Sequence, residues 1–261
     1  MSKLQFDYGM QLHYSEPVTQ CHYTLKCIPQ NTEMQKITDL NIAIEPHTNY
    51  QRSTDSFGNL MIYDNLYFPH SSFTVRVSGC AETWLSVAQQ DDGSALRFRH
   101  PHGLNRAGDG LRAYYASLQP LHFPSPYDTA LHLMHCLHRD FAYTPAVTTV
   151  DTSAEDAWRL GQGVCQDYAH IFIALCHMAG IPARYITGMM LGEGHSHAWV
   201  EILSGNYWYA MDPTNNCIVG DTYIKIAHGR DAKDCVINKG IIKGGGSQQQ
   251  TVTVRVTKEN I

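Results

Sequence analysis

The sequence lacks three features, and each absence excludes a class of protein. Its 19 Lys and Arg residues against 24 Asp and Glu residues give a formal net charge of −5, and no segment gathers the basic residues into a stripe, so we expect no nucleic-acid partner. No apolar run approaches the roughly 18 residues that span a bilayer, and the opening MSKLQFDYGM has no apolar signal-peptide core. We therefore expect a cytoplasmic protein with no membrane partner.

Paired cysteine motifs are also missing. None of the eight cysteines forms a C-x-x-C motif, so we expect reduced thiols, most of them buried as small hydrophobic side chains. They are Cys21, Cys27, Cys80, Cys136, Cys165, Cys176, Cys217 and Cys235. Cys165 is the candidate exception, because it stands at the first turn of a long apolar helix in GQGVCQDYAHIFIALCHMAG. Its side chain could be inert packing, a metal ligand or a nucleophile.

The hydrophobic pattern divides the chain into two parts. Short runs such as LQFDYGMQLHY and FTVRVSG alternate apolar and polar residues between turn clusters, which predicts an N-terminal β-sandwich domain over residues 1–95. Residues 96–125 are rich in Arg, His, Gly and Pro without a sustained period, and we interpret them as a linker.

Residues 126–261 mix helical and strand patterns. YDTALHLMHCLHRDF has apolar residues at helical spacing, and the helix of Cys165 ends at Gly180 and Pro182. The runs ARYITGMML, HAWVEIL, YWYAMD and TVTVRVT then read as strands. We predict an α+β domain over this range.

The start of a helix is a favourable place for a reactive thiol. Unpaired backbone N–H groups and the helix dipole stabilise a thiolate, so we expect the pKa of Cys165 to fall below the free value of about 8.5. Asp167 in the same turn opposes this effect, and a base is still needed.

A candidate base lies on a predicted hairpin around LSGN. If the turn is Ser204-Gly205, His197 faces Asp212 directly. If the turn is Gly205-Asn206, Asp212 faces Trp199 and lies diagonal to His197 on the same face. Either register permits a hydrogen bond between the imidazole and the carboxylate. A thiol, an imidazole and a carboxylate are the parts of a nucleophilic acyl-transfer site.

A second group of residues has spacings that suit zinc. HLMHCLH places His132 and Cys136 four residues apart, and His135 and His138 three apart. No further ligand block is evident, and histidines on the polar side of an amphipathic helix explain the same pattern. We predict no metal.

Three blocks resemble the transglutaminase-like superfamily, in particular its bacterial cysteine-protease-like members with an N-terminal β-domain. They are GVCQDYAH at 163–170, SHAWVE at 196–201 and DPTNN at 212–216, supported by FAYTP at 141–145, GRD at 229–231 and DSFGN at 55–59. The resemblance implies a papain-like α+β core, in which the helix bearing the cysteine packs on an antiparallel sheet. It also implies Cys165 as nucleophile, His197 as general base and acid, Asp212 as the residue that orients His197, and no cofactor.

Further candidate site residues are suggested by their places beside Cys165 and His197. The oxyanion requires donors, for which the backbone N–H of Cys165 and, less specifically, Gln162 are candidates. Trp199, on the face of His197, and His195, in the preceding loop, are candidates for the wall of a substrate groove.

The leading functional hypothesis is hydrolysis of a peptide or amide bond through a thioester on Cys165, with a peptide, protein or amide substrate. Nothing marks a dedicated amine site, so water is the default acceptor. Transglutaminase-type transamidation or amide formation is the enzymatic alternative. A catalytically idle protein-binding module is the alternative from another class. The sequence leaves the oligomeric state and the role of the N-terminal domain open.

Overall fold

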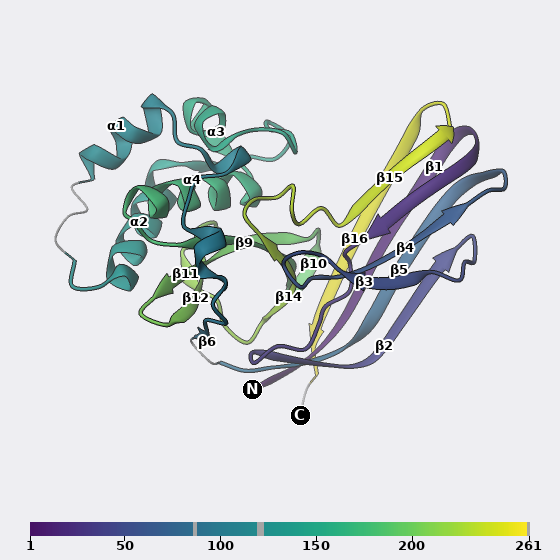
Figure 1. The fold of residues 1–261 in the computed structure, drawn as a ribbon, viewed down its shortest axis with the longest axis horizontal. Coiled ribbons are helices and arrows are strands. Elements are labelled where there is room, and N and C mark those ends of the chain that lie inside the picture. The colour runs from purple at the N-terminus through teal and green to yellow at the C-terminus, as the bar shows by residue number, and fades with distance from the viewer. Residues whose placement is uncertain (86–87, 119–122, 260–261) are drawn as a thin grey trace.

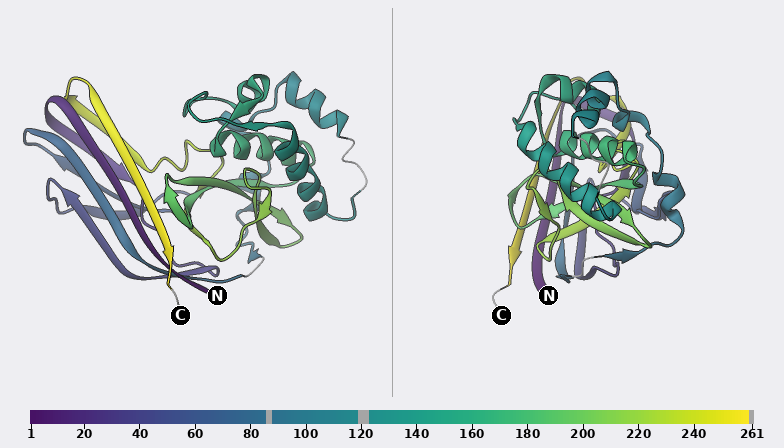
Figure 2. Two further views of the ribbon diagram at one scale, coloured as in Figure 1. Left: turned by 180° about the vertical axis from the view of Figure 1, so that it is seen from behind. Right: turned by 90° about the vertical axis from the view of Figure 1, so that its left-hand side faces the viewer.

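The computed structural model describes residues 1–85, 88–118 and 123–259 (Figure 1). A long, bent antiparallel sheet forms one side of the molecule, and a smaller sheet with helices forms the other (Figures 1 and 2). Among the described residues, no helix is both long and apolar enough to cross a membrane.

The long sheet is built around β1, Ser2–Leu25. The side chains of β1 alternate between a buried and an exposed face, as LQFDYGMQLHY predicts. On one side β1 pairs with β15 (Asn238–Gly244) and β16 (Gln248–Lys258), and on the other with β4 (Leu60–Leu66) and β5 (His70–Thr83). The outer strands β2 (Gln35–Glu45) and β3 (Gln51–Thr54) pair with β5 and β4.

Two expectations from the sequence are corrected by these pairings. The strands form one hydrogen-bonded eight-stranded sheet rather than the two facing sheets of a sandwich. The run TVTVRVT also pairs with β1, so the sheet takes strands from both ends of the chain and the termini lie close together (Figure 2). The alternating pattern identified the strands, but it carries no information on which distant strand each one meets.

The smaller sheet has the order β13 (Cys217–Ile218), β12 (Tyr207–Asp212), β11 (His197–Ser204), β9 (Ala183–Met190) and β14 (Tyr223–Gly229), all antiparallel, with β6 (Gln89–Gln90) beside β12. A short strand, β10 (Gly192–Gly194), leaves this region and pairs with β16 of the long sheet. The remaining strands, β7 (Ala142–Tyr143) and β8 (Gln162–Gly163), pair with each other just before the cysteine-bearing helix.

The helices α2 (Pro126–Asp140) and α4 (Cys165–Met178) pack on this sheet, and α1 (Asp109–Ser117) and α3 (Ala154–Leu160) pack on α4. Every residue of α4 from Asp167 to Cys176 is buried, because its apolar side chains contact both the sheet and the surrounding helices. The segment interpreted as a linker contains α1 and two 3-10 turns, η1 (Ser94–Phe98) and η2 (Gly103–Asn105).

Two side-chain amides attach the long sheet to β14. The Gln35 amide donates to the backbone carbonyl of Lys225 at 2.8 Å and accepts from its N–H at 2.8 Å. The Asn59 amide makes the same pair of contacts with His228, at 2.7 and 2.9 Å. Each amide therefore replaces a missing strand neighbour, which fixes the position of the long sheet beside the smaller one.

Candidate active site

Cys165 is the first residue of α4, as the sequence predicts. The turn that precedes it is held by Asp167, whose carboxylate accepts the backbone N–H of Val164 at 2.8 Å and the hydroxyl of Thr148 at 2.7 Å. Burial raises the pKa of Asp167, although both donors act against that shift. Five of the eight cysteines are buried, whereas Cys165 is partly exposed.

His197 and Asp212 are brought together by the hairpin of β11 and β12. The ladder runs from Val200 opposite Met211 to Ser204 opposite Tyr207, so the turn is Gly205-Asn206 and the second of the two expected registers is correct. Asp212 lies diagonal to His197 on the same face, and the imidazole Nε2 is 2.7 Å from the carboxylate Oδ2.

Asp212 is completely buried and accepts five hydrogen bonds. Besides His197, the Asn215 amide donates at 2.7 Å, the Tyr223 hydroxyl at 2.9 Å, and the backbone N–H groups of Thr214 and Asn215 at 2.9 and 3.1 Å. Burial alone raises the pKa of a carboxyl, but these donors and the imidazole hold the pKa of Asp212 below its usual value. The carboxylate therefore stays ionised.

Tyr223 and Asn215 are contributors that the sequence reasoning did not assign. Asn215 follows Asp212 by three residues, and an Asx turn in DPTNN was a detectable signal. Tyr223 belongs to β14, at the far edge of the sheet order from β12, and no local pattern indicates that its hydroxyl reaches Asp212.

Two neighbours act on the imidazole of His197. Burial lowers the pKa of a histidine, but Asp212 and Cys165 outweigh burial and raise the pKa of His197 to about 9. His197 is thus hydrogen-bonded to Asp212 and lies near Cys165.

The other residues proposed from the sequence occupy different positions. Gln162 lies in β8, partly buried, and pairs through its backbone with Ala142 of β7. Trp199 is only 2 % exposed and stacks beside His197, with ring centroids 6.4 Å apart, so it supports the imidazole from within the core. His195 is exposed in the loop between β10 and β11.

The four residues of α2 whose spacing suits zinc do not converge on a common site; they are His132, His135, Cys136 and His138. The Cys136 sulfur lies 3.6 Å from Nε2 of His132, whereas His135 contacts the side chain of Asn216 at 2.5 Å. These side chains therefore serve separate contacts.

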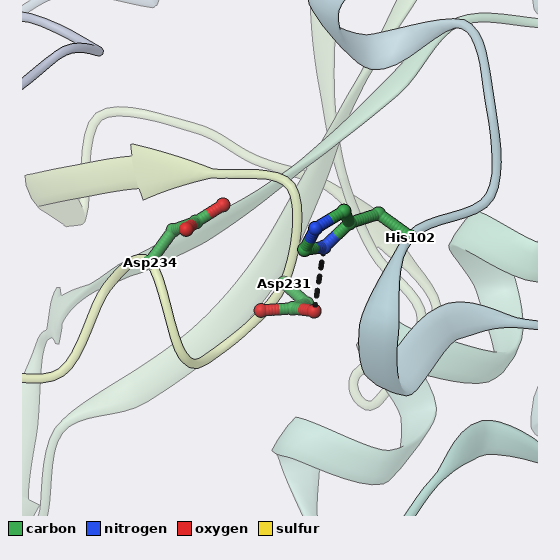
Figure 3. A group of neighbouring side chains, drawn as sticks. All are labelled: His102, Asp231 and Asp234. Carbon is green, nitrogen blue, oxygen red and sulfur yellow. Dashed lines mark hydrogen bonds and ion pairs between the residues drawn. The ribbon is translucent and has the colours of Figure 1, made fainter.

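One cluster outside the site also has ligand-type residues. His102, Asp231 and Asp234 place their polar atoms within 4.8 Å of one another (Figure 3). The Asp231 carboxylate accepts the backbone N–H groups of Leu104 and Lys233 and contacts the His102 ring, whereas Asp234 forms a two-pronged ion pair with Arg230. Because the carboxylate oxygens of Asp231 and Asp234 already accept these hydrogen bonds, we infer that the cluster holds the GRD loop, residues 229–231, in place.

Two family models match parts of this chain. Residues 121–213 match the Transglutaminase-like superfamily, and residues 4–82 match the Bacterial transglutaminase-like N-terminal region. An uncharacterised protein of Mycobacterium leprae is 27 % identical over 269 residues, which cover 94 % of this chain and 95 % of that protein. A protein-glutamine gamma-glutamyltransferase of Pseudomonas aeruginosa is 32 % identical over 131 residues, which cover 43 % of this chain and 19 % of that enzyme.

The crystal structure of a candidate cysteine protease from Cytophaga hutchinsonii has the same fold. It superimposes with a TM-score of 0.82 at 21 % identity, covering 100 % of this chain and 91 % of that one. The long bent sheet is thus part of the shared fold, together with the smaller sheet and its helices.

Proposed function

Because this chain belongs to the transglutaminase-like superfamily, we propose that it catalyses acyl transfer through a thioester on Cys165, with hydrolysis of a peptide or amide bond as its reaction. The observation that carries the proposal is the 2.7 Å contact between His197 and the buried Asp212 carboxylate, near the partly exposed Cys165. In the papain-like arrangement that we propose for this core, the cysteine starts a buried helix and its base lies on the adjoining sheet.

The reaction proceeds in two stages. The Cys165 thiol gives its proton to His197 and the sulfur attacks the carbonyl carbon. As the C–N bond breaks, His197 transfers this proton to the leaving amine. A water molecule then gives a proton to His197 and attacks the thioester, which releases the acid and restores the thiol–imidazole pair. Asp212 stays ionised and keeps the imidazole oriented in both stages.

The tetrahedral intermediate carries a negative oxygen that needs preorganised donors. The backbone N–H of Cys165 is free of the helix ladder, because the first N–H groups of a helix have no partner within it. Gln162 lies three residues earlier, and we propose its side chain as the second donor.

Transamidation is the second candidate function. It is favoured by the 32 % identity to a protein-glutamine gamma-glutamyltransferase over 131 residues, although that match covers only 19 % of that enzyme. The thioester stage is common to both reactions, and the acceptor alone distinguishes them. A cytoplasmic location stays part of the proposal, since a reducing compartment keeps eight unpaired thiols reduced.

The test begins with the nucleophile. Brief treatment with a limiting amount of iodoacetamide at about pH 6, followed by intact-mass analysis and peptide mapping, should label Cys165 ahead of the other seven cysteines. His197→Ala should abolish this selectivity, and His138→Ala, a change at an exposed histidine of α2, should preserve it. Labelling that is indifferent to His197 would favour the idle binding module.

The acceptor is tested next. Casein is incubated with the protein, with and without a biotinylated primary amine, and hydrolysis and biotin incorporation are measured together. Release of new amino termini without incorporation supports hydrolysis, and incorporation supports transamidation. Cys165→Ala should remove either activity, and Cys80→Ala, at another partly exposed thiol, should not.

A further inference from the structure

A cavity of about 480 Å³ lies between the long sheet and the smaller sheet. The long sheet contributes Tyr8 of β1 and Val252 of β16, and the smaller sheet contributes Tyr185 and Thr187 of β9. Its volume is sufficient for a substrate side chain with part of the adjoining backbone.

The cavity opens beside the proposed nucleophile. Gln166, which follows Cys165, and Ser196, which precedes His197, both line it. Tyr185, which lines the cavity, also lies near Cys165. Burial raises the pKa of its hydroxyl, and the charge of Cys165 raises that pKa further. A substrate held at Cys165 therefore meets the mouth of the cavity.

The lining is uncharged apart from two side chains that form an ion pair with each other. Among the described residues that line the cavity, the charged ones are Asp151 and Lys233, which form an ion pair of 3.0 Å with each other. A charged substrate group would lose water in the cavity without gaining an unpaired counter-charge, which is unfavourable.

The mouth of the cavity exposes apolar side chains. Val150 is 73 % exposed and Val236 is 40 % exposed, and both belong to the lining. Exposed apolar side chains around a pocket are typical of a surface that contacts a ligand. Together with the buried Tyr8 and Tyr185, they favour an apolar occupant.

We propose that this cavity binds an uncharged, apolar side chain of the peptide substrate next to the scissile amide, and that the long sheet thereby determines substrate specificity. The inference rests on the proposed function for its chemistry. It gives the long sheet a direct contact with the substrate through Tyr8 and Val252.

Neighbouring glutamines on β16 permit a matched test. Gln250 pairs with Leu12 and lines the cavity, whereas Gln249 pairs with His13 on the opposite face, and both are exposed. Gln250→Glu therefore adds one negative charge to the cavity with almost no change in shape. Gln249→Glu adds the same charge to the same strand outside the cavity.

The readout is the rate at which Cys165 is alkylated by three probes: iodoacetamide, N-(2-phenylethyl)iodoacetamide and N-(2-trimethylammonioethyl)iodoacetamide. Each rate is divided by the rate of the same probe with glutathione. We expect the phenylethyl probe to react about tenfold faster than the cationic probe in the unchanged protein. Gln250→Glu should reduce this ratio about tenfold, and Gln249→Glu should leave it unchanged.

A second variant changes size instead of charge. Val236→Trp narrows the mouth at an exposed position and should remove the advantage of the phenylethyl probe while the iodoacetamide rate is kept. Equal normalised rates for the two larger probes in the unchanged protein would overturn the inference. An equal response of the ratio to both glutamate variants would also overturn it.

The measurements are repeated at about pH 9, where an ordinary exposed thiol is largely ionised. The probe ratio is then obtained even if Cys165 is not activated. Failure of the proposed function would appear in the iodoacetamide rate at pH 6, whereas failure of this inference would appear in the ratio between the larger probes.

Discussion

The His197 Nε2 and the Asp212 Oδ2 lie 2.7 Å apart, although they belong to different strands of a hairpin and are not directly paired in its ladder. The diagonal relationship lets the imidazole reach across to the carboxylate, while the donors Asn215 and Tyr223 hold the buried carboxylate in place. The orientation of the proposed base is therefore set by the sheet rather than by a flexible loop.

Replacing Asp212 tests this relationship. Asp212→Asn keeps the size of the side chain, but an amide stabilises the wrong imidazole tautomer, so we expect kcat/KM to fall on the order of 10²- to 10⁴-fold. Selective labelling of Cys165 at pH 6 should be lost as well. Asp109→Asn, at an exposed end of α1, serves as the control for a general effect of removing a carboxylate. Full activity in Asp212→Asn would contradict the role of this residue.

Tyr223 should act as a positioning residue through Asp212. Tyr223→Phe removes a 2.9 Å hydrogen bond of about 0.5–1.5 kcal/mol, so we expect about a threefold to tenfold loss of kcat with little change in KM. The acid limb of the pH profile should move to higher pH, because Asp212 loses a donor that stabilises its charged form. Tyr207→Phe, at an exposed tyrosine of β12, should change neither quantity.

The pKa of His197 predicts how stability varies with pH. Burial lowers this pKa, but Asp212 and Cys165 raise it to about 9, above the unfolded value of about 6.5. The stability that His197 contributes is thus fully present below about pH 6.5 and is lost as the pH rises through 9. The difference in urea midpoint between the unchanged protein and His197→Ala should narrow from pH 6.5 to pH 10. A constant difference would contradict the raised pKa.

The sequence was sufficient to predict the local geometry of the candidate site but not the sheet that surrounds it. Cys165, His197 and Asp212 were found because a helix start and a hairpin are local structures whose faces follow from residue spacing. The sequence alone does not decide between the two hairpin registers, since Ser204-Gly205 and Gly205-Asn206 are both acceptable turns; the strand pairing in the structure does.

Long-range pairing explains the remaining differences. The pattern of TVTVRVT indicates a strand but does not identify β1 as its partner, and the single bent sheet follows from that pairing. Gln35 and Asn59 look like ordinary polar residues in the sequence, yet they pair with the backbone of β14.

A buried charge network on the smaller sheet should be sensitive to loss of its centre. Glu201 contacts Arg184 at 2.6 Å and Lys225 at 2.8 Å, and these cations outweigh burial and lower the pKa of Glu201 to about 2. Glu201→Gln leaves both cations without a buried counter-charge, so we expect a loss of about 3–5 kcal/mol in the free energy of unfolding.

The control for Glu201 is an exposed glutamate with a similar partner. Glu193 forms a 3.0 Å ion pair with Arg255 at the surface, and Glu193→Gln should cost no more than about 1 kcal/mol. Urea denaturation of both variants at pH 7 measures the difference. Equal effects would mean that the buried network is screened as strongly as a surface pair.

Gly188 supports the site through the space that it leaves empty. It lies opposite His197 in the ladder of β9 and β11, and a Cβ there would stand 2.3 Å from the Trp199 ring and 2.3 Å from the Ile224 carbonyl oxygen. Moving either neighbour costs free energy, since Trp199 is buried and the carbonyl belongs to the backbone of β14. We expect Gly188→Ala to lose about 1–3 kcal/mol of stability.

The same substitution should also impair the nucleophile, because Trp199 stacks on His197 and its displacement moves the imidazole. Labelling of Cys165 by iodoacetamide at pH 6 should fall in the fraction of Gly188→Ala that remains folded, as judged by circular dichroism. Gly240→Ala is the matched control in a strand, since a Cβ there would meet only the His22 carbonyl oxygen at 3.4 Å. Retention of rapid labelling in Gly188→Ala would mean that the position of His197 does not depend on the packing of Trp199.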